Sequence, residues 1–471
     1  MSDIIKDRYE KLNLLVNKGI DPFGGKFSVS AQIKEVIADF KAGGKTTIAG
    51  RIMAKRKHGK SIFCDLRDET EKMQLYFNND ILGGEKFEIV DSMLDIGDII
   101  GARGELFKTR TGEPTLKVED FAVLSKSLRP LPEKWHGLKD VETRYRQRYL
   151  DLIANPAVKD IFKTRSEIIK SIRSILDRKG YLEVETPMMQ PIAGGAAGKP
   201  FKTHHEALDM DLYLRVAPEL YLKKLLVGGF EKVYEINKSF RNEGISIRHN
   251  PEFTMLEAYT AYSDCEGTME LTRELITETA KKVLGKDKIE YQDTVIDLTK
   301  WEKVSFAAIM KESYGINPDD DEKEWVKKLK VKGVEVENKN IGRTQVANII
   351  ADLLTPKSNH PVFVVDMFKD LCPLAKVKKD DPLLTDRFEL FMGGMEVANA
   401  YSELNNPIEQ KERFQEQRED GEIDEDFIRA LEYGMPPAGG LGIGIDRLVM
   451  LFTNSPSIRD VILFPQLRKE V

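Results

Sequence analysis

The sequence predicts an α+β fold in two parts, a small N-terminal β-barrel and a larger domain in which a large antiparallel sheet is flanked by helices. Two observations give this expectation. Five short alternating or β-branched runs lie between residue 46 and about residue 125, separated by charged turns, which is typical of a small barrel. From residue 151 onward strand and helix patterns mix, and hairpin signals such as "MGGM" at 392–395 indicate antiparallel pairing.

The composition is that of a soluble globular chain. Its 471 residues suffice for about three domains, and 32% are charged against 41% hydrophobic. No run approaches the ~18 apolar residues of a membrane span, and the N-terminal stretch interleaves charged and apolar residues. Cys64, Cys265 and Cys372 lie far apart without a C-x-x-C pair, which argues against a disulfide framework or a zinc site. We therefore expect a cytoplasmic protein with reduced thiols and no membrane contact.

The N-terminal region divides into three segments. Residues 1–45 contain a helical stretch and the turn-rich connector "GIDPFGGKF", and residues 129–150, with the proline-bearing "SLRPLPEKWHG", read as a linker. Between them, residues 46–128 hold the runs "TTIAGRIMA", "KSIFCDLRD", "KMQLYF", "DIIGARGELFKT" and "TLKVEDFAVL". The oligonucleotide-binding (OB) barrel is the commonest soluble barrel of this size, so we expect an OB-fold here.

A basic run, "RIMAKRKHGK" at 51–60, lies in the first of these strands. It contains Arg51, Lys55, Arg56, Lys57 and Lys60 with no acidic residue, although the whole chain carries a net charge of −6. The local distribution favours a polyanionic partner such as a nucleic acid. A basic run is also the ordinary composition of a solvated face, so this run alone does not decide.

The larger domain, residues 151–471, begins with a predicted amphipathic helix in "NPAVKDIFKTRSEIIKSIRSILDRKG". Its apolar residues at roughly helical spacing are Ile161, Ile168, Ile172, Ile175 and Leu176. Gly180 is placed to cap the C-terminus, and the strand "YLEVETP" follows directly. Residues 305 to about 355, rich in Lys and helical in pattern, indicate an insertion into this domain.

The first stretch that indicates chemistry is "EINKSFRNEGISIRHNPEFTMLEAY" at 235–259, which reads as strand, loop and strand. The first arm places Arg241 and Glu243 on one face. The second arm places four residues on one face by period two: Phe253, Met255, Glu257 and Tyr259. An arginine offers a fork for a phosphate, an aromatic ring a surface for a purine, and a carboxylate an acceptor for an amine. A surface hairpin of salt bridges is the alternative, but it would not need apolar residues alongside.

The second stretch is "GGLGIGIDRLVMLF" at 439–452. Gly440, Gly442 and Gly444 alternate with apolar residues, so one strand face carries no side chains and lets a flat ring or a backbone approach closely. Asp446 is a good N-cap for the helix that follows, with Arg447 projecting from its first turn. As a dinucleotide fingerprint the stretch is weak, because the G-x-G-x-x-G spacing is missing.

The third stretch is "DRFELFMGGMEVANAYSELNNP" at 386–407. With Gly393 and Gly394 as a two-residue turn, Glu389 and Glu396 fall on the same face of a hairpin, where they can share hard cations bound to phosphate. A further set shares a face by period two but has the opposite parity to Glu396: Asn399, Tyr401 and Glu403. For all five to face one cavity, a β-bulge must lie near Val397 or Ala398.

Three motifs resemble the signature motifs of class II aminoacyl-tRNA synthetases, in order and at plausible separations: "GYLEVETP", "FRNEG" to "EFTMLE", and "GLGIGIDRL". The barrel before the larger domain is similar to the subgroup that charges Asp, Asn and Lys. Within it, "RYRQRYLDLI", "RVAPELYLK", "FRNEGISIRHNPEFTMLE" and "YGMPPAGGLGIGIDR" resemble lysyl-tRNA synthetases. The resemblance covers nearly the whole chain.

The resemblance implies ATP-dependent attachment of L-lysine to its tRNA through a lysyl-adenylate, with Mg²⁺ bound to ATP. It implies a nucleotide site in which Arg241 and Glu243 hold the α-phosphate and adenine, Phe253 and Arg447 sandwich the adenine, and His249 lies near the outer phosphates. Arg241 and Arg447 would be the catalytic residues through charge stabilisation, and Glu389 and Glu396 would hold Mg²⁺. The implied lysine pocket consists of Gly195, Glu219, Glu257, Tyr259, Asn399, Tyr401 and Glu403.

Glu403 is our choice for the ε-ammonium of the substrate. A closed pocket must give that charge a partner or lose several kcal/mol to desolvation, and Glu403 is the only carboxylate among the three residues of its strand face. Tyr259 or Tyr401 would flank the stem, and Glu257 and Glu219 would meet the α-ammonium. In the alternative reading, Glu403 lies in solvent at a strand end.

Two partners also follow from the resemblance. The barrel would read the tRNA anticodon, with Phe63 stacking on a base and Arg51 and its basic neighbours meeting phosphates; alternatively, Phe63 belongs to the barrel core. The helix ending at Gly180 and the strand before Pro187 resemble the motif that forms the subunit interface, which implies a homodimer.

Several alternatives stay open. His249 also fits a loop-packing histidine and Glu219 a helix-capping carboxylate. The chain could charge aspartate or asparagine, although their pocket would want a basic residue, or be a paralogue that only binds tRNA or that lysylates a protein. Cys372 stands where the family has a serine, and Ala398 and Ala400 stand where it has glycines, which we expect to tighten the lysine pocket.

Overall fold

The computed structural model describes residues 3–132, 138–196, 198–336, 342–354, 356, 358–417 and 423–469. It divides into two compact units, Met1–Lys139 and Asp140–Val471. The expected linker at 129–150 spans this division, and its residues 133–137 lie outside the described part of the chain.

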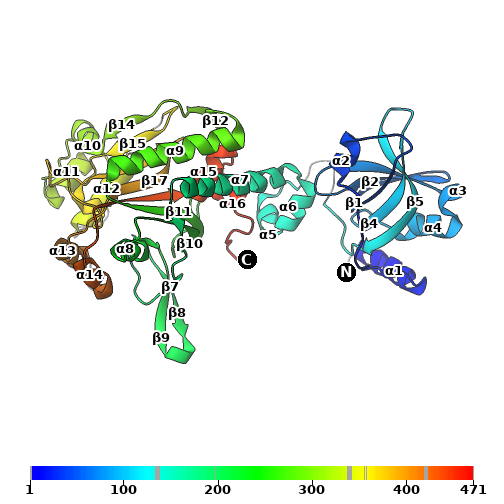
Figure 1. Cartoon of the computed structure of the whole chain (residues 1–471), viewed down its shortest axis with the longest axis horizontal. Helices are drawn as coiled ribbons and strands as arrows, with labels where there is room; N and C mark the ends of the chain where they lie inside the picture. The colour runs from blue at the N-terminus through cyan, green and yellow to red at the C-terminus, as the bar shows by residue number, and fades with distance from the viewer. Residues whose placement is uncertain are drawn as a thin grey trace. The chain divides into compact units, whose positions relative to one another are not determined.

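The first unit is a closed five-stranded barrel with the strand order β1-β2-β3-β5-β4 (Figure 1). Its strands are β1 (Lys45–His58), β2 (Ser61–Arg67), β3 (Lys72–Asn78), β4 (Ile99–Lys108) and β5 (Pro114–Ser125). Alternate residues such as Ile62, Cys64 and Leu66 are fully buried inside it. The predicted OB-fold barrel is therefore confirmed, with all five strands where the alternating runs place them.

Short helices complete this unit. They are α1 (Asp3–Asn17), α2 (Ile33–Ala38), α3 (Asn79–Leu82), α4 (Gly84–Glu88) and a π-helical turn, η1 (Ile89–Met93). Buried Arg8 attaches α1 to the barrel, because its guanidinium donates to the carbonyls of Ser127 and Ile96, each at 2.8 Å. Fully buried Lys126 pairs with Asp98 at 2.9 Å beside this contact.

The second unit is built on an eight-stranded sheet with the order β14-β15-β16-β17-β18-β11-β10-β6. Its strands are β6 (Leu182–Glu183), β10 (Lys232–Phe240), β11 (Glu252–Ala261), β14 (Glu302–Ser305), β15 (Val362–Val365), β16 (Arg387–Met392), β17 (Met395–Ser402) and β18 (Ala438–Gly444). The central pairs are antiparallel, and the outermost pairs β14–β15 and β10–β6 are parallel. The α+β expectation is thus confirmed.

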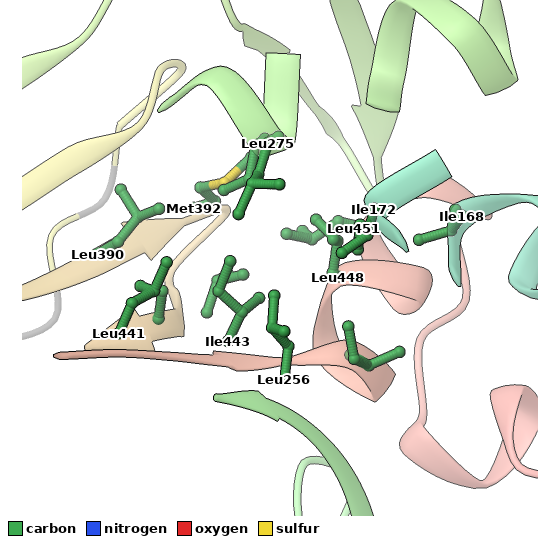
Figure 2. Packing of buried hydrophobic residues seen from close by; sticks show 14 of the residues in the cluster. Ile168, Ile172, Leu256, Leu275, Leu390, Met392, Leu441, Ile443, Leu448 and Leu451 are labelled. Atoms are coloured by element: carbon green, nitrogen blue, oxygen red, sulfur yellow. The ribbon is translucent and has the colours of Figure 1, made fainter. Parts of the chain in front are cut away.

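One face of this sheet is covered by three helices, α7 (Ala157–Arg178), α9 (Cys265–Leu284) and α15 (Ile445–Phe452). Figure 1 shows α7 and α9 over the sheet, and the two helices are in contact. Figure 2 shows their side chains meeting those of the strands in one core, including Ile172, Leu275, Leu448, Leu256 and Ile443. The predicted helix ends as expected, because Gly180 follows α7 with a φ of +79° and the Tyr181 amide donates to the Leu176 carbonyl.

The opposite face of the sheet meets α8 (Glu219–Val227), α13 (Pro407–Gln417) and α14 (Glu425–Glu432). Leu222 of α8, Tyr259 of β11, Tyr401 of β17 and Phe427 of α14 belong to a second apolar cluster there. Residues of β11 and β17 that point away from the helix-covered core therefore point to this side, where the candidate site lies.

Along the chain, three helices connect β14 to its parallel neighbour β15. They are α10 (Phe306–Tyr314), α11 (Glu322–Val331) and α12 (Arg343–Asp352). They surround a separate apolar core that contains Trp325, Leu329 and Ile350. Residues 337–341, 355 and 357 of the expected insertion lie outside the described chain.

The remaining elements of this unit are short. They are α5 (Val141–Arg146), α6 (Arg148–Ala154), α16 (Ile458–Val461), β7 (Met189–Gln190), β8 (Phe201–His205), β9 (Met210–Leu214), β12 (Lys288–Tyr291), β13 (Thr294–Asp297) and the 3₁₀ turns η2 (Glu206–Leu208) and η3 (Lys369–Leu371). Across both units, the described helices include none of the length and apolarity that a membrane crossing requires.

Candidate active site

A cleft opens on the face of the sheet away from the covering helices. It is formed by the loop after β10, by β11, by the start of β17 and by the junction of β18 with α15. The five residues expected to contact ATP all line it: Arg241, Glu243, His249, Phe253 and Arg447. Glu396 and Asn399 of β17 also line this cleft. The segments around β10 and β11, the strand β17 and the glycine-rich strand β18 therefore converge here, as the sequence patterns predict.

The ring of Phe253 forms one wall of this cleft. Phe253 and Met255 point away from the core, because their neighbours Leu256 and Ala258 fill it. The Arg241 guanidinium lies 5.3 Å from the centre of the Phe253 ring, within cation–π range, and the Arg241 Nε has no hydrogen-bond partner. Arg241 and Glu243 belong to the loop after β10 rather than to a strand arm, and Glu243 is exposed.

Arg447 connects two sides of the cleft. Its Nη1 donates to the Glu396 carbonyl at 2.7 Å and lies 3.1 Å from the Glu396 carboxylate, while its Nη2 lies 3.2 Å from the His249 Nε2. Partial burial, with the nearby charge of Arg447, lowers the pKa of His249 below its ordinary value. A neutral imidazole can therefore sit beside two arginines without repelling them.

Asp446 does not have the predicted capping role. The helix begins at Ile445, so Gly444 is its N-cap and makes no side-chain cap. Asp446 is buried instead, where one carboxylate oxygen accepts from the Thr254 amide at 2.7 Å and the other from Arg165 at 2.5 Å. It attaches α15 to β11 and α7, which fixes the direction of Arg447.

Glu389 and Glu396 share a face because of the two-residue turn between their strands, and a β-bulge brings Asn399, Tyr401 and Glu403 to the same face. The predicted turn is present, since Gly393 and Gly394 both have positive φ and Met392 pairs with Met395. Leu390 pairs with Ala398 and Phe391 with Glu396, so Val397 is the extra residue. The bulge expected near Val397 or Ala398 is thus confirmed.

This carboxylate pair is electrostatically strained. Burial raises the pKa of Glu389 to about 7, with Arg387 opposing and Glu396 reinforcing the shift. The Arg387 guanidinium lies 2.6 Å from the Glu389 carboxylate, a contact that the sequence reading missed although the two residues share a strand face. The described residues contain no group of three or more His, Cys, Asp or Glu side chains arranged to hold a metal. Two carboxylates that repel each other beside a cleft with free arginine donors fit a hard cation that brings its own phosphate ligands.

Further along β17 the same strand face meets a cluster of six buried side chains, here called the inner pocket: Glu219, Lys223, Glu257, Tyr259, Tyr401 and Glu403. The Tyr401 hydroxyl donates to Glu219 at 2.6 Å, and the Tyr259 hydroxyl donates to Glu257 at 3.1 Å. Glu403 lies in this pocket and not in solvent, which rules out the strand-end alternative.

Lys223 was not among the predicted site residues. Its Nζ lies 2.7 Å from the Glu219 carboxylate and also contacts the Glu403 carboxylate, and its side chain is fully buried. The only signal in the sequence is the i, i+4 spacing of Glu219 and Lys223 on one helix. Glu219 is the first residue of α8, where it pairs with Lys223 and Tyr401 and does not act as the N-cap.

The pocket carboxylates are held against a strong desolvation cost. Burial raises the pKa of Glu257 to about 8, and the charge of Glu219 adds to the shift. Burial also raises the pKa of Glu403 well above its ordinary value, while Lys223 opposes the shift. For Lys223 burial favours the neutral form, but Glu219 and Glu403 outweigh burial and raise its pKa.

The glycine strand gives Glu403 its space. A Cβ atom at Gly440 would lie 1.8 Å from the Glu403 Oε1 and 2.7 Å from a ring carbon of Tyr259. Gly195, with a φ of +87°, stands beside Glu219, since a Cβ there would lie 3.5 Å from the Glu219 Cβ. Asn399 faces the outer cleft with Glu396, one step before Tyr401 on the same strand face.

Two departures from the family pattern lie outside the pocket. Ala398 and Ala400 pack in the helix-covered core, and Ala398 also lines the outer cleft beside Asn399, so neither is part of the inner pocket. The reason is the bulge, which turns Val397 and Ala398 both inward. Cys372 is buried in the apolar cluster that includes Leu220 and Tyr401, next to the pocket.

On the barrel, Phe63 lies on the outer face, because its neighbours Ile62 and Cys64 fill the interior. Its ring centre is 5.1 Å from that of Tyr76, and the Tyr76 ring is 5.8 Å from Phe107. The cross-strand partner of Phe63 is Arg56.

Arg51 lies elsewhere on the barrel. It is half-buried and donates to the Gly97 carbonyl at 2.7 Å, and it pairs with Arg67 and Ile99 rather than with the strand positions beside Phe63. Burial lowers its pKa from the ordinary value. Lys55 is similarly engaged with the carbonyls of Asp91 and Leu94 at 2.8 Å.

Comparison with known proteins agrees with this geometry. Residues 140–468 match the family model "tRNA synthetases class II (D, K and N)", and residues 46–124 match "OB-fold nucleic acid binding domain". The chain is 54% identical over 483 residues to the lysine–tRNA ligase of Pelotomaculum thermopropionicum, covering 99% of this chain and 95% of the relative. It is 54% identical over 481 residues to that of Carboxydothermus hydrogenoformans (99% and 98% covered) and 50% identical over 489 residues to that of Halalkalibacterium halodurans (99% and 97%). The chain therefore belongs to the class II tRNA synthetase family and, within it, to the lysine–tRNA ligases.

Proposed function

We propose that the chain attaches L-lysine to the 3′ end of its tRNA in two steps driven by ATP. The observation that carries this proposal is the charge of the inner pocket. Among the six inner-pocket side chains, Glu219, Glu257 and Glu403 are buried acids and Lys223 is the one cation, which contacts Glu219 and Glu403. The nearby Arg215 acts on Glu257 but is itself paired with Glu235. With the three carboxylates and Lys223 ionised, two negative charges of the inner pocket are unmatched. An amino acid with two ammonium groups matches both.

The individual contacts assign each ammonium. The Glu403 Oε1 has no hydrogen-bond partner, and Gly440 leaves it room, so it accepts from the ε-ammonium. Tyr259 and Tyr401 flank the stem of the substrate. Glu219, next to Gly195, and Glu257 meet the α-ammonium. A side-chain carboxylate of aspartate would be repelled by this lining, which disfavours that substrate.

The outer cleft supplies the nucleotide site. Phe253 and Arg447 enclose the adenine, Arg241 binds the α-phosphate, and Glu243 accepts from the adenine amine. His249 lies beside the outer phosphates. Glu389 and Glu396 would hold Mg²⁺, which neutralises phosphate charge when bound. Asn399 lies between the two ligands on the β17 face.

The chemistry needs no side-chain nucleophile. The lysine carboxylate attacks the α-phosphorus and pyrophosphate leaves; the 3′-hydroxyl of the tRNA then attacks the carbonyl of the resulting anhydride and the nucleotide leaves. Arg241 and Arg447 stabilise the charge that develops on the phosphate oxygens, and the inner pocket fixes the direction of the carboxylate. A paralogue that only binds tRNA is disfavoured, because the cleft and the pocket keep all of these side chains.

The barrel is the proposed tRNA-binding surface. Phe63, Tyr76 and Phe107 form an aromatic platform on its outer face, with Arg56 opposite Phe63. Bases of a single-stranded anticodon stack on such a platform, and arginine meets their phosphates. We propose this region, and not Arg51, as the centre of anticodon contact.

Two further proposals concern the protein as a whole. β6 is an edge strand of the large sheet and its Leu182 is 47% exposed, which supports a homodimer formed through α7 and β6. All three cysteines are buried and free, which supports a reducing cytoplasmic location.

ATP–pyrophosphate exchange tests the reaction directly. With each amino acid offered separately, exchange is expected with lysine, and with aspartate or asparagine at least about a hundredfold less, because their side chains leave the Glu403 charge, assigned to the ε-ammonium, unmatched. Exchange that is strongest with aspartate or asparagine would refute the proposal.

Glu403→Gln keeps the shape of the side chain and removes its charge. A hydrogen bond to a charged group contributes about 1.5 to 3 kcal/mol, so the lysine KM is expected to rise about 10- to 150-fold while the ATP KM stays within about twofold. Glu432→Gln, at the exposed C-terminal end of α14, is the matched control. A wild-type lysine KM in Glu403→Gln would overturn the assignment of the ε-ammonium.

Phe63→Ala tests the barrel surface. Base stacking contributes about 1 to 3 kcal/mol, so the KM for tRNA in the charging reaction is expected to rise about 5- to 150-fold. Lysine-dependent exchange, which needs no tRNA, should not change. Phe23→Ala removes another exposed phenylalanine of the same unit, 54% exposed, and should leave both reactions unchanged. Equal tRNA KM values in wild type and Phe63→Ala would remove Phe63 from the interface.

Analytical ultracentrifugation tests the homodimer. At micromolar concentration the chain is expected to sediment as a dimer, and Leu182→Asp should shift it toward the monomer, because a charge at the exposed edge strand disfavours pairing. Leu208→Asp, at another exposed leucine (65%), is the control and should leave the dimer intact. Monomeric wild type would refute the proposal.

A further inference from the structure

Lys223 occupies the place where a substrate lysine is expected to find its partners. It lies on α8 one turn after Glu219, and its Nζ contacts the carboxylates of both Glu219 and Glu403. The Nζ also lies 5.6 Å from the centre of the Tyr401 ring, one of the rings that flank the substrate stem. A protein cation thus lies between the two carboxylates to which the substrate ammonium groups are assigned.

A purely structural ion pair does not explain this arrangement. A buried cluster that serves only stability pairs its charges and satisfies its polar atoms, because each unmatched buried charge costs several kcal/mol. Here one cation meets two carboxylates, a third lies close enough to influence them, and the Glu403 Oε1 stays without a partner. The neighbouring buried pair of Arg215 and Glu235, at 2.8 Å, is by contrast balanced.

We propose that Lys223 is a specificity-determining positioning residue for lysine: it holds the Glu219 and Glu403 carboxylates in fixed directions and neutralises one of the three pocket carboxylates, so that the pocket matches an amino acid with two ammonium groups. This inference rests on the proposed function. Lys223 does not take part in the chemical steps.

This role of Lys223 makes lysine binding depend on pH in a way that can be measured. The titratable groups that face Lys223 are Glu219 on its own helix, Glu257 and Tyr259 of β11, Tyr401 and Glu403 of β17, and Cys372 in the loop after η3. Burial favours the protonated form of Glu403, and the charge of Lys223 opposes this. Without Lys223 the pKa of Glu403 rises further, so this carboxyl holds its proton to a higher pH, and a protonated carboxyl does not attract an ammonium group. Raising the pH removes that proton and restores the attraction.

Lysine-dependent ATP–pyrophosphate exchange by Lys223→Met provides the test, since methionine fills similar space without the charge. At pH 7 the lysine KM is expected to rise at least tenfold, with the ATP KM within twofold of wild type. The ratio of variant to wild-type lysine KM should fall at least threefold between pH 7 and pH 8.5. Lys223→Arg keeps the charge, so the ratio of its lysine KM to that of the wild type should not change with pH. This holds even if the larger side chain raises the lysine KM at every pH.

Lys224→Met is the matched control, because Lys224 is the next residue of α8 and pairs outward with the exposed Asp426 at 2.7 Å. It should leave the lysine KM unchanged. If Lys223→Met does not fold, Lys223→Gln, which keeps hydrogen-bond donors but no charge, is expected to show the same pH-dependent ratio. An unchanged or lowered lysine KM, or a ratio that does not vary with pH, would overturn the role of Lys223. Absence of lysine-dependent exchange in the wild type would instead overturn the proposed function itself.

Discussion

Each of the strands β11, β17 and β18 must place apolar side chains on one face, toward the helices, and the polar or small residues of the site on the other. The site depends on the strand register that satisfies both faces. Leu256, Leu441 and Ile443 must face the apolar core under α7, α9 and α15, which fixes the register of β11 and β18. Every second residue then faces the cleft or the pocket. A slip of one residue would bury the carboxylates among the helices and expose the core, so the packing of the sheet and the placement of the site are set by the same register.

The bulge at Val397 lets β17 keep this register and still place Glu396 and Glu403 on the site face. Without it, Glu396 and Glu403 would lie on opposite faces of β17, because seven positions separate them. The extra residue places both on the site face while Val397 and Ala398 pack inward. One strand thus carries a carboxylate to the phosphate end of the cleft and another to the far end of the inner pocket. The glycines of β18 complete the arrangement, since Gly440 gives the Glu403 carboxylate its space.

The sequence predicts those features that depend on local pattern. Period-two alternation places Phe253, Met255, Glu257 and Tyr259 correctly, and the parity conflict along β17 predicts the bulge. The parts that it misses depend on contacts between distant segments. Lys223 meets Glu403 across 180 positions of chain. Asp446 meets Arg165 and Thr254 instead of capping its own helix, because the helix starts two residues earlier than the pattern suggests. Arg51 donates to the Gly97 carbonyl, a contact that the sequence pattern does not indicate.

The buried carboxyl groups of the inner pocket lower the free energy of unfolding, and the same groups make the pocket selective for a positively charged ligand. The pKa of Glu257 is about 8 in the folded chain, against about 4.3 for an unperturbed glutamate. Between these values the folded state holds a proton that the unfolded state has lost, so this group lowers the free energy of unfolding as the pH rises through that range. An ammonium group that enters the pocket takes the place of the proton and removes the penalty. The energy that the empty pocket costs the fold is therefore recovered on binding by a ligand whose positive charges match the carboxylates, and an uncharged side chain of the same length cannot recover it.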